Sequence, residues 1–396
     1  MFRTRSSRLL WAGVTLALVS SPAFALDGQD LLRKITAAAN LQPGNLEAAS
    51  VDVTGANVVL KGVSLGDAKG GERVTVGDIL LEDVQEESDG GYSITRVTFP
   101  NVNFSEKETT ITASDMKLTN VLVPGDATKG TIDSLLFYEE ASTGPVSVTV
   151  AGKQVAGISR TTFTMERADD NSGIGFDGAV EGISADLSSI DDPKSREAID
   201  SLGLTKLDGK MTMQGSWDLE PGTINVDEYA FDFTNVGRLN LSFSLSGYTM
   251  SFIKSLQETA KAAEANPNKE AAQQAAGLAM LGLLQQLTFN SAEISFEDSG
   301  LTNRGLSYAG KTQGVSGDQM AMMVKGMAPL MLAQLNIPSL QNSLSAAINT
   351  FIDNPKNFTI SAEPANPIPL PMIIGTAQAA PNTLPEMLGV TVTANQ

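Results

Sequence analysis

The 396-residue chain contains no cysteine and no histidine. Without cysteine it can form no disulfide, and without histidine it lacks the commonest general base and the commonest metal ligand in proteins. Zinc, haem and iron–sulfur sites of the usual kinds are disfavoured, and nucleophilic sites of the Ser-His or Cys-His kind are excluded. We therefore expect a protein that is not an enzyme and that has no cofactor and no metal site.

Basic residues are scarce as well. The chain has 27 lysines and arginines against 45 aspartates and glutamates, which gives a formal net charge of −18 at pH 7. Nucleic acid and an anionic lipid surface are therefore unfavourable electrostatic partners. The acids are spread along the chain rather than gathered in one loop, which disfavours a calcium-loaded surface.

Long apolar runs are missing after Ala25, so no later segment is expected to span a bilayer as a helix. Residues 1–25 have the three parts of a secretory signal peptide, namely a basic start, a short apolar core at 9–20 and a small-residue cleavage site at 23–25. An uncleaved anchor is the alternative, but the core is short and Pro22 breaks it. Because paired arginines and cysteine are absent, we predict Sec export to the periplasm as a soluble protein that is not a lipoprotein.

A four-residue phrase recurs about every 20 residues near the start of the expected mature chain. A unit of this length can hold a strand, a turn and a return strand. We infer tandem β units laid side by side, each of which needs its neighbour to bury its apolar face. The copies are Leu60–Val63, Leu81–Val84, Phe99–Val102 and Leu118–Val121, with variants at Val180–Ile183 and Phe233–Val236.

Period-two alternation of apolar and polar residues predicts β structure throughout residues 48–248, after a short helix at 27–40. Beyond residue 250 the period becomes helical, with two returns to strand and a proline-rich extended segment. We expect a signal peptide at 1–25, a repetitive β-sheet region with a short N-terminal helix at 26–250, and a helical cover with terminal strands at 251–396. The later elements are a helical hairpin at 251–287, a strand at 288–297, helices at 301–311, 320–331 (pausing at Pro329) and 340–352, strands at 358–360 and 390–392, and the extended segment from Pro364 to Pro371.

Four short patterns could carry chemistry, and each has a favoured structural explanation. The segment 173–178 fits the dinucleotide pattern G-x-G-x-x-G, but it lacks the strand–helix context, which favours a flexible turn. The segment 251–254 fits the S-x-x-K motif of penicillin-recognising enzymes, but the partner motifs are absent. The segment 169–173 favours a solvated turn over a calcium loop. The methionines at 320–331 could form an adaptable surface for a hydrophobic partner, and ordinary helix core is favoured.

The degenerate Leu-x-Asn-Val repeats of this cysteine-free chain resemble those of the periplasmic AsmA-like and YdgA-like envelope proteins of Gram-negative bacteria, above all uncharacterised alphaproteobacterial members. Residues 301–306, 313–316 and 354–361 resemble the same group. The resemblance covers most of the chain as a loose pattern and carries no catalytic residues. It implies a long curved sheet with an apolar inner trough, which larger relatives use in envelope lipid handling. Those relatives have an N-terminal membrane anchor, which we expect this chain to lack.

The expected fold is β-rich α+β, with a long curved antiparallel repeat sheet whose apolar trough is partly covered by helices in the C-terminal third. Because few helices follow residue 250, part of the trough should stay open, and an open apolar trough is a binding site. We predict a periplasmic protein of envelope maintenance that binds a lipid acyl chain or an apolar polypeptide segment, with an envelope protein as a further candidate partner. The predicted ligand-binding residues are Met211, Met213, Trp217, Phe231, Phe233, Leu241 and Phe243.

Three alternatives remain open. A non-enzymatic periplasmic scaffold or interaction protein would have a fully covered sheet, because most apolar stripes are core. An outer-membrane barrel is disfavoured by 6% aromatic residues, by the missing aromatic girdles and by the long helical segments. An enzyme would need an unusual carboxylate or Ser-Lys site, and no such site is evident.

Overall fold

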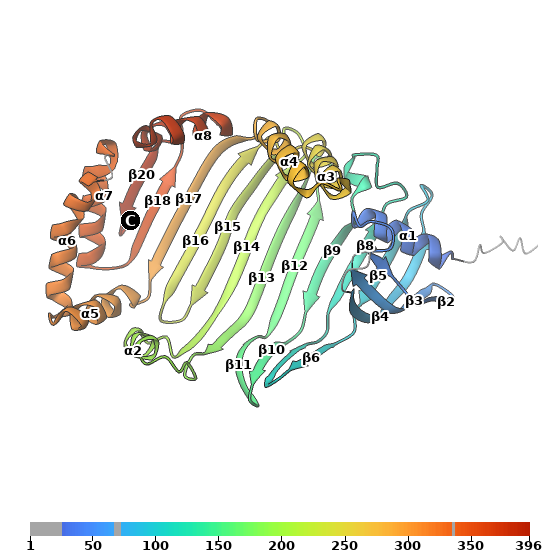
Figure 1. Ribbon diagram of the computed structural model, residues 1–396, viewed down its shortest axis with the longest axis horizontal. Coiled ribbons are helices and arrows are strands. Elements are labelled where there is room, and N and C mark those ends of the chain that lie inside the picture. The colour runs from blue at the N-terminus through green and yellow to red at the C-terminus, as the bar shows by residue number, and fades with distance from the viewer. Residues whose placement is uncertain (1–25, 67–72, 335–336) are drawn as a thin grey trace, which may run out of the picture.

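The computed structural model describes residues 26–66, 73–334 and 337–396; the predicted signal peptide at 1–25 lies outside them. The described strands form one open antiparallel sheet of 20 strands, in which consecutive stretches of chain lie side by side (Figure 1). This confirms the predicted fold class. The strands are β1 (Leu46–Glu47), β2 (Ser50–Thr54), β3 (Asn57–Gly66), β4 (Arg73–Glu86), β5 (Tyr92–Thr98), β6 (Val102–Glu106), β7 (Thr109–Ala113), β8 (Lys117–Val123), β9 (Phe137–Thr143), β10 (Val146–Val150), β11 (Lys153–Ile158), β12 (Arg160–Arg167), β13 (Gly173–Asp186), β14 (Lys206–Asp218), β15 (Thr223–Phe233), β16 (Gly237–Ser246), β17 (Thr288–Asp298), β18 (Asn357–Ala362), β19 (Ile368–Pro369) and β20 (Val390–Ala394).

The helices lie around this sheet rather than in a continuous layer across it (Figure 1). Most of them agree with the sequence, including the hairpin of α3 and α4 that the Asn-Pro-Asn joint predicts. No helix among the described residues is long and apolar enough to cross a membrane. The helices are α1 (Gly28–Ala38), α2 (Pro193–Leu202), α3 (Met250–Ala265), α4 (Lys269–Leu284), α5 (Leu301–Gln313), α6 (Gly317–Gln334), α7 (Pro338–Asp353), α8 (Leu370–Ala379) and α9 (Leu384–Met387).

Three predictions about the helices and the proline-rich segment were wrong. Helix α2 interrupts a region that was predicted to be β throughout; the Asp192 carboxylate caps it by accepting a hydrogen bond from the backbone N–H of Ser195. Helix α6 runs through Pro329 without a pause. Helix α8 begins at Leu370, so the extended segment ends at Pro369, and Pro371 lies in the first helical turn, where its missing N–H needs no partner.

The recurring four-residue phrase has a distinct backbone conformation. Its third residue is left-handed at Gly62 (φ +58°), Asp83 (φ +53°) and Asn120 (φ +49°). Gly, Asp and Asn adopt this conformation at the lowest cost. The left-handed residue interrupts strict alternation, so that the apolar ends of the phrase face the same side although they are three residues apart. The phrase therefore keeps one face of the sheet apolar along strands too long for simple alternation.

The N-terminal end of the sheet has a closed core under α1. The Asp27 side chain caps this helix, and Leu31 on its inner side is fully buried. Leu31 belongs to one buried cluster with side chains of β3, β4, β5 and β8, including Val58 and Leu81. Smaller clusters lie under the α3–α4 hairpin, around Phe252, and under α7. In the described part of the chain, these clusters mark where helices pack on the apolar face.

Candidate functional site

The middle of the sheet presents one continuous apolar face. Directly paired residues of an antiparallel sheet lie on the same face. From Met211 on β14, the register leads to Phe231 on β15, Leu239 on β16 and Phe296 on β17. We call this surface the open apolar face; it comprises Phe163, Phe176, Met211, Met213, Tyr229, Phe231, Leu239, Leu241, Phe243, Ile294, Phe296 and Ile360.

Large side chains on this face remain accessible to solvent. Phe243 is 44% exposed, Ile294 48% and Ile360 40%, whereas Val58 and Leu81 under α1 are exposed by no more than 1%. In Figure 1 the helices stand at the ends and along the edges of β13 to β17, and their middle carries no helix. The apolar face is therefore covered at its ends and open at its centre.

All seven predicted ligand-binding residues lie on the same side of β14, β15 and β16. Met213 pairs through Tyr229 with Leu241, and Met211 pairs with Phe231. Phe233 follows two residues after Phe231 and shares its side of β15. Whether this group binds a ligand stays a prediction.

Trp217 lies at the covered end of this face. Its indole Nε1 donates a 2.8 Å hydrogen bond to the carbonyl oxygen of Tyr248, and the two rings meet edge to face. Tyr248 in turn contacts Phe252 on the buried side of α3. Trp217 thus anchors the α3 end of the face more than it lines the open centre.

Sequence reasoning missed the part of the open apolar face contributed by β17 and β18. Ile294 pairs with Leu241 on one side and with Ile360 on the other. The signal was available, because residues 292–296 alternate in the same way as β16 does. These strands extend the accessible surface beyond the predicted residues.

The opposite face is polar and internally hydrogen-bonded. Asn290 donates hydrogen bonds to Ser244 and Ser246, and Ser244 donates one to Asn225. The hydrogen bond from Thr212 and the nearby Arg238 guanidinium lower the pKa of Glu228. Polar side chains with such partners are stable in contact with water. The apolar face, not this one, is therefore the candidate binding surface.

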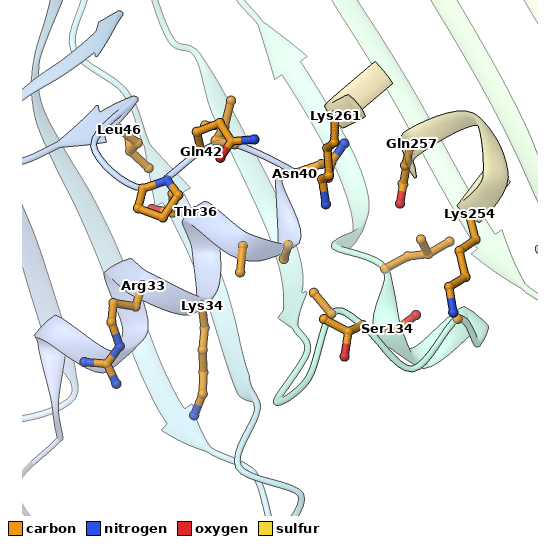
Figure 2. A pocket seen from close by; sticks show the side chains of 18 of the residues that line it. Arg33, Lys34, Thr36, Asn40, Gln42, Leu46, Ser134, Lys254, Gln257 and Lys261 are labelled. Carbon is orange, nitrogen blue, oxygen red and sulfur yellow. The ribbon is translucent and has the colours of Figure 1, made fainter. Parts of the chain in front are cut away.

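A second feature is a cavity of about 880 Å³ between α1 and α3. Figure 2 shows Arg33 and Lys34 on the α1 side, Lys254 and Lys261 on the α3 side, and Ser134 in the loop before β9. Among the residues lining the cavity, four are cationic and only Asp30 and Glu258 are acidic. The cavity is therefore a locally cationic site in an acidic protein.

Half of these cations already have structural partners. Lys34 Nζ lies 2.6 Å from Asp30 and donates to the Gly90 carbonyl oxygen at 2.5 Å, and Arg33 also pairs with Asp30. Burial raises the pKa of Asp30, but hydrogen bonds from Lys34 and Tyr92 and the two neighbouring charges outweigh it and lower the pKa. Among the described residues, the side chains of Lys254 and Lys261 have no ion-pair or hydrogen-bond partner.

The short sequence patterns contribute no chemical site. Residues 173–178 lie within β13 rather than in a turn, and Ser251 is in the first turn of α3, where its hydroxyl meets that of Thr249. Residues 169–172 form the expected exposed turn, and Gly173 is the buried first residue of β13. No group of three or more acids that could hold a metal ion occurs in 26–66, 73–334 and 337–396.

The prediction that the methionines of α6 form helix core was wrong for most of them. Met320 is buried, together with Ala328 and Leu332. The other methionines are exposed, although α5 and α7 both contact this helix. The exposed large residues of α6 are Met322, Met323, Met327, Leu330 and Met331.

A family model described only as an uncharacterized protein matches residues 230–395. That range begins within β15 and includes the open apolar face from β16 to β18 as well as the C-terminal helices. The search of curated proteins found no match.

Proposed function

We propose that this protein is a non-enzymatic binding protein of the cell envelope that holds a lipid acyl chain against its open apolar face. The observation that carries the proposal is the exposure of Phe243, Ile294 and Ile360 on one side of the sheet, where no described helix covers them. Contiguous exposed apolar surface of this kind is rare in proteins without an apolar ligand or partner. Burying it against an acyl chain would gain about 25 cal/mol per Å².

An acyl chain fits this surface better than a polypeptide segment does. A polypeptide needs partners for its backbone N–H and C=O groups, and the open apolar face offers side chains, not free strand edges. An acyl chain has no such groups. From β12 to β18 the face crosses six inter-strand steps of about 4.8 Å, or roughly 29 Å in total, which is long enough for an extended fatty-acyl chain.

Location in the periplasm is part of the same proposal. It is supported by the three-part signal sequence at 1–25, which lies outside the described residues, and by the resemblance of the repeats to AsmA-like and YdgA-like envelope proteins. Envelope maintenance is the role that this resemblance favours.

The test is uptake of a fluorescent fatty acid by delipidated protein. Changing Phe243→Gln and Ile294→Gln together should weaken binding by tenfold or more, roughly the effect of placing two amides against an acyl chain. The matched control, Ser242→Gln with Ser295→Gln, alters the neighbouring residues of the same strands on the polar face and should leave binding unchanged. No uptake by the unaltered protein, or equal losses in both variants, would refute the proposal.

A second candidate function is that of an interaction protein, and the outward side of α6 favours it. Met322, Met327 and Met331 present an uncharged, flexible apolar surface of the kind that adapts to protein partners. A pure scaffold is expected to have a fully covered sheet, whereas Phe243 and Ile294 are exposed on this one. Pull-downs that recover an envelope protein without lipid, and lose it in Met327→Lys, would favour this function.

A further inference from the structure

Helix α3 borders both the open apolar face and the cationic cavity. On one side Phe252 is buried with Leu245 and Tyr248, beside Trp217 at the end of the face. On the other side Met250, Lys254, Gln257 and Lys261 line the cavity. Residues three and four apart share one side of a helix, so this division follows from the sequence of α3.

The apolar surface also continues toward α1. Tyr138 packs against the core under α1 and contacts Phe163, which in turn stacks on Phe176 of the open apolar face, with both ring pairs 6.4 Å apart. Tyr138 comes three residues after Leu135, which lines the cavity. Both helices that form the cavity therefore adjoin ends of the same apolar surface.

The charges of the cavity favour an anion. Lys34 and Arg33 form ion pairs with Asp30, but Lys254 and Lys261 lack a partner among the described residues. In Figure 2, Lys254 and Gln257 extend into the space between α3 and the loop that holds Ser134. Ammonium groups and side-chain amides are donors for an oxyanion, and charge-assisted hydrogen bonds are the stronger ones. A phosphate, with more acceptor oxygens than a carboxylate, uses such a donor set more fully.

We infer that the cavity between α1 and α3 binds a phosphate group, and that this phosphate is the headgroup of the lipid whose acyl chain lies on the open apolar face. Only the second part of this inference, that the phosphate is a lipid headgroup, rests on the proposed function. The strongly negative chain disfavours docking onto an anionic membrane, but a local cationic site can still hold one phosphate. The chemistry is that of a phosphate ester, which a phospholipid or a free phosphate compound can supply.

The experiment compares lipids that differ only in the headgroup. Full-length mature protein is titrated with phosphatidic acid, with diacylglycerol of identical acyl chains and with glycerol 3-phosphate. The test variant is Lys254→Glu with Lys261→Glu. The matched control is Lys194→Glu with Lys356→Glu, two exposed lysines elsewhere that undergo the same change of charge.

The unaltered protein should bind phosphatidic acid about tenfold more tightly than diacylglycerol, the worth of one charge-assisted hydrogen bond. The test variant should lose this preference and keep its affinity for diacylglycerol, while the control keeps both. If the preference persists in the test variant, the headgroup site is refuted and the proposed function stands. If no lipid binds but glycerol 3-phosphate does, and only in the unaltered protein and the control, the proposed function fails and the site is one for a free phosphate compound. Binding of none of the three refutes both.

Discussion

Two regions of one sheet give similar side chains opposite environments. Under α1, Val58, Val63 and Leu81 are exposed by no more than 1%. In the middle of the sheet Phe243 and Ile294 lie on the same face, and nearly half of each is exposed. The strands alternate similarly in both regions, so the difference comes from the helix that packs on one region and not on the other. The first region stabilises the fold, and the second leaves apolar side chains exposed.

The largest expected contrast is in stability. Leu81→Ala should lower the free energy of unfolding by about 2–5 kcal/mol, because it removes a buried side chain and leaves a cavity. Ile294→Ala should cost less than about 1 kcal/mol, since the side chain is already half exposed. Urea denaturation of both variants measures the difference. Equal losses would mean that the centre of the sheet is as well packed as the α1 end.

A smaller effect is expected at the left-handed position of the repeated phrase. Gly62 has φ +58°, and an added Cβ would lie 3.1 Å from the Cβ of Ala49. Gly62→Ala should therefore destabilise the protein by about 1–2 kcal/mol. The control is Gly305→Ala within α5, which meets no atom within 4 Å and should stabilise by about 0.5–1 kcal/mol. Thermal unfolding that moves in the same direction for both would contradict the role assigned to Gly62.

The smallest expected effect concerns the ion pairs that hold α1 on the sheet. The pKa of Asp30 is lower in the folded protein than in the unfolded chain, so its carboxylate stabilises the fold above pH 4 or so, and this contribution is lost as the pH falls through the folded value. Asp30→Asn should cost about 1 kcal/mol at pH 7 and flatten the dependence of stability on pH below about 4.

The control for this prediction is Asp52→Asn. Asp52 pairs with Lys61 at 2.5 Å, but both side chains are about half exposed, so solvent screens the pair. Its removal should change stability less than Asp30→Asn does. Denaturation at pH 7 and at pH 3 compares the two variants, and a larger loss for Asp52→Asn would contradict the assigned role of Asp30.

Local pattern predicted most elements. Alternation in β14 and β16, the helical hairpin at 251–287 and the short helix at 27–40 all correspond to the structure. Helix α2 was missed because its ten residues lie between strands and bury no side chain, so no apolar period marks them. The extended proline segment was assigned too far because prolines are also accommodated in the first turn of a helix, as in α8.

The candidate site was predicted in part. The alternation of apolar and polar residues along β14, β15 and β16 predicts that Met211, Phe231 and Leu241 lie on one face. The register of the sheet confirms that they share it. The exposed methionines of α6 were misassigned, because an apolar helix gives no sign of whether a second layer covers its outer side. Lys254 and Lys261 were not identified as site residues either, since isolated lysines on a helix are ordinary in sequence.

By itself the sequence determined the alternation that makes one face of each strand apolar, and the Gly, Asp and Asn residues that keep this face continuous through the repeats. It also excluded histidine and cysteine chemistry. Only the tertiary structure decided where α1 covers that face, where the face stays open, and that residues of α1 and α3 line one cationic cavity. The physical reason is the distance along the chain over which each effect acts. The alternation of apolar and polar residues and the backbone preferences act between near neighbours in the sequence. Arg33 and Lys254 line one cavity only because the sheet brings distant stretches of chain together.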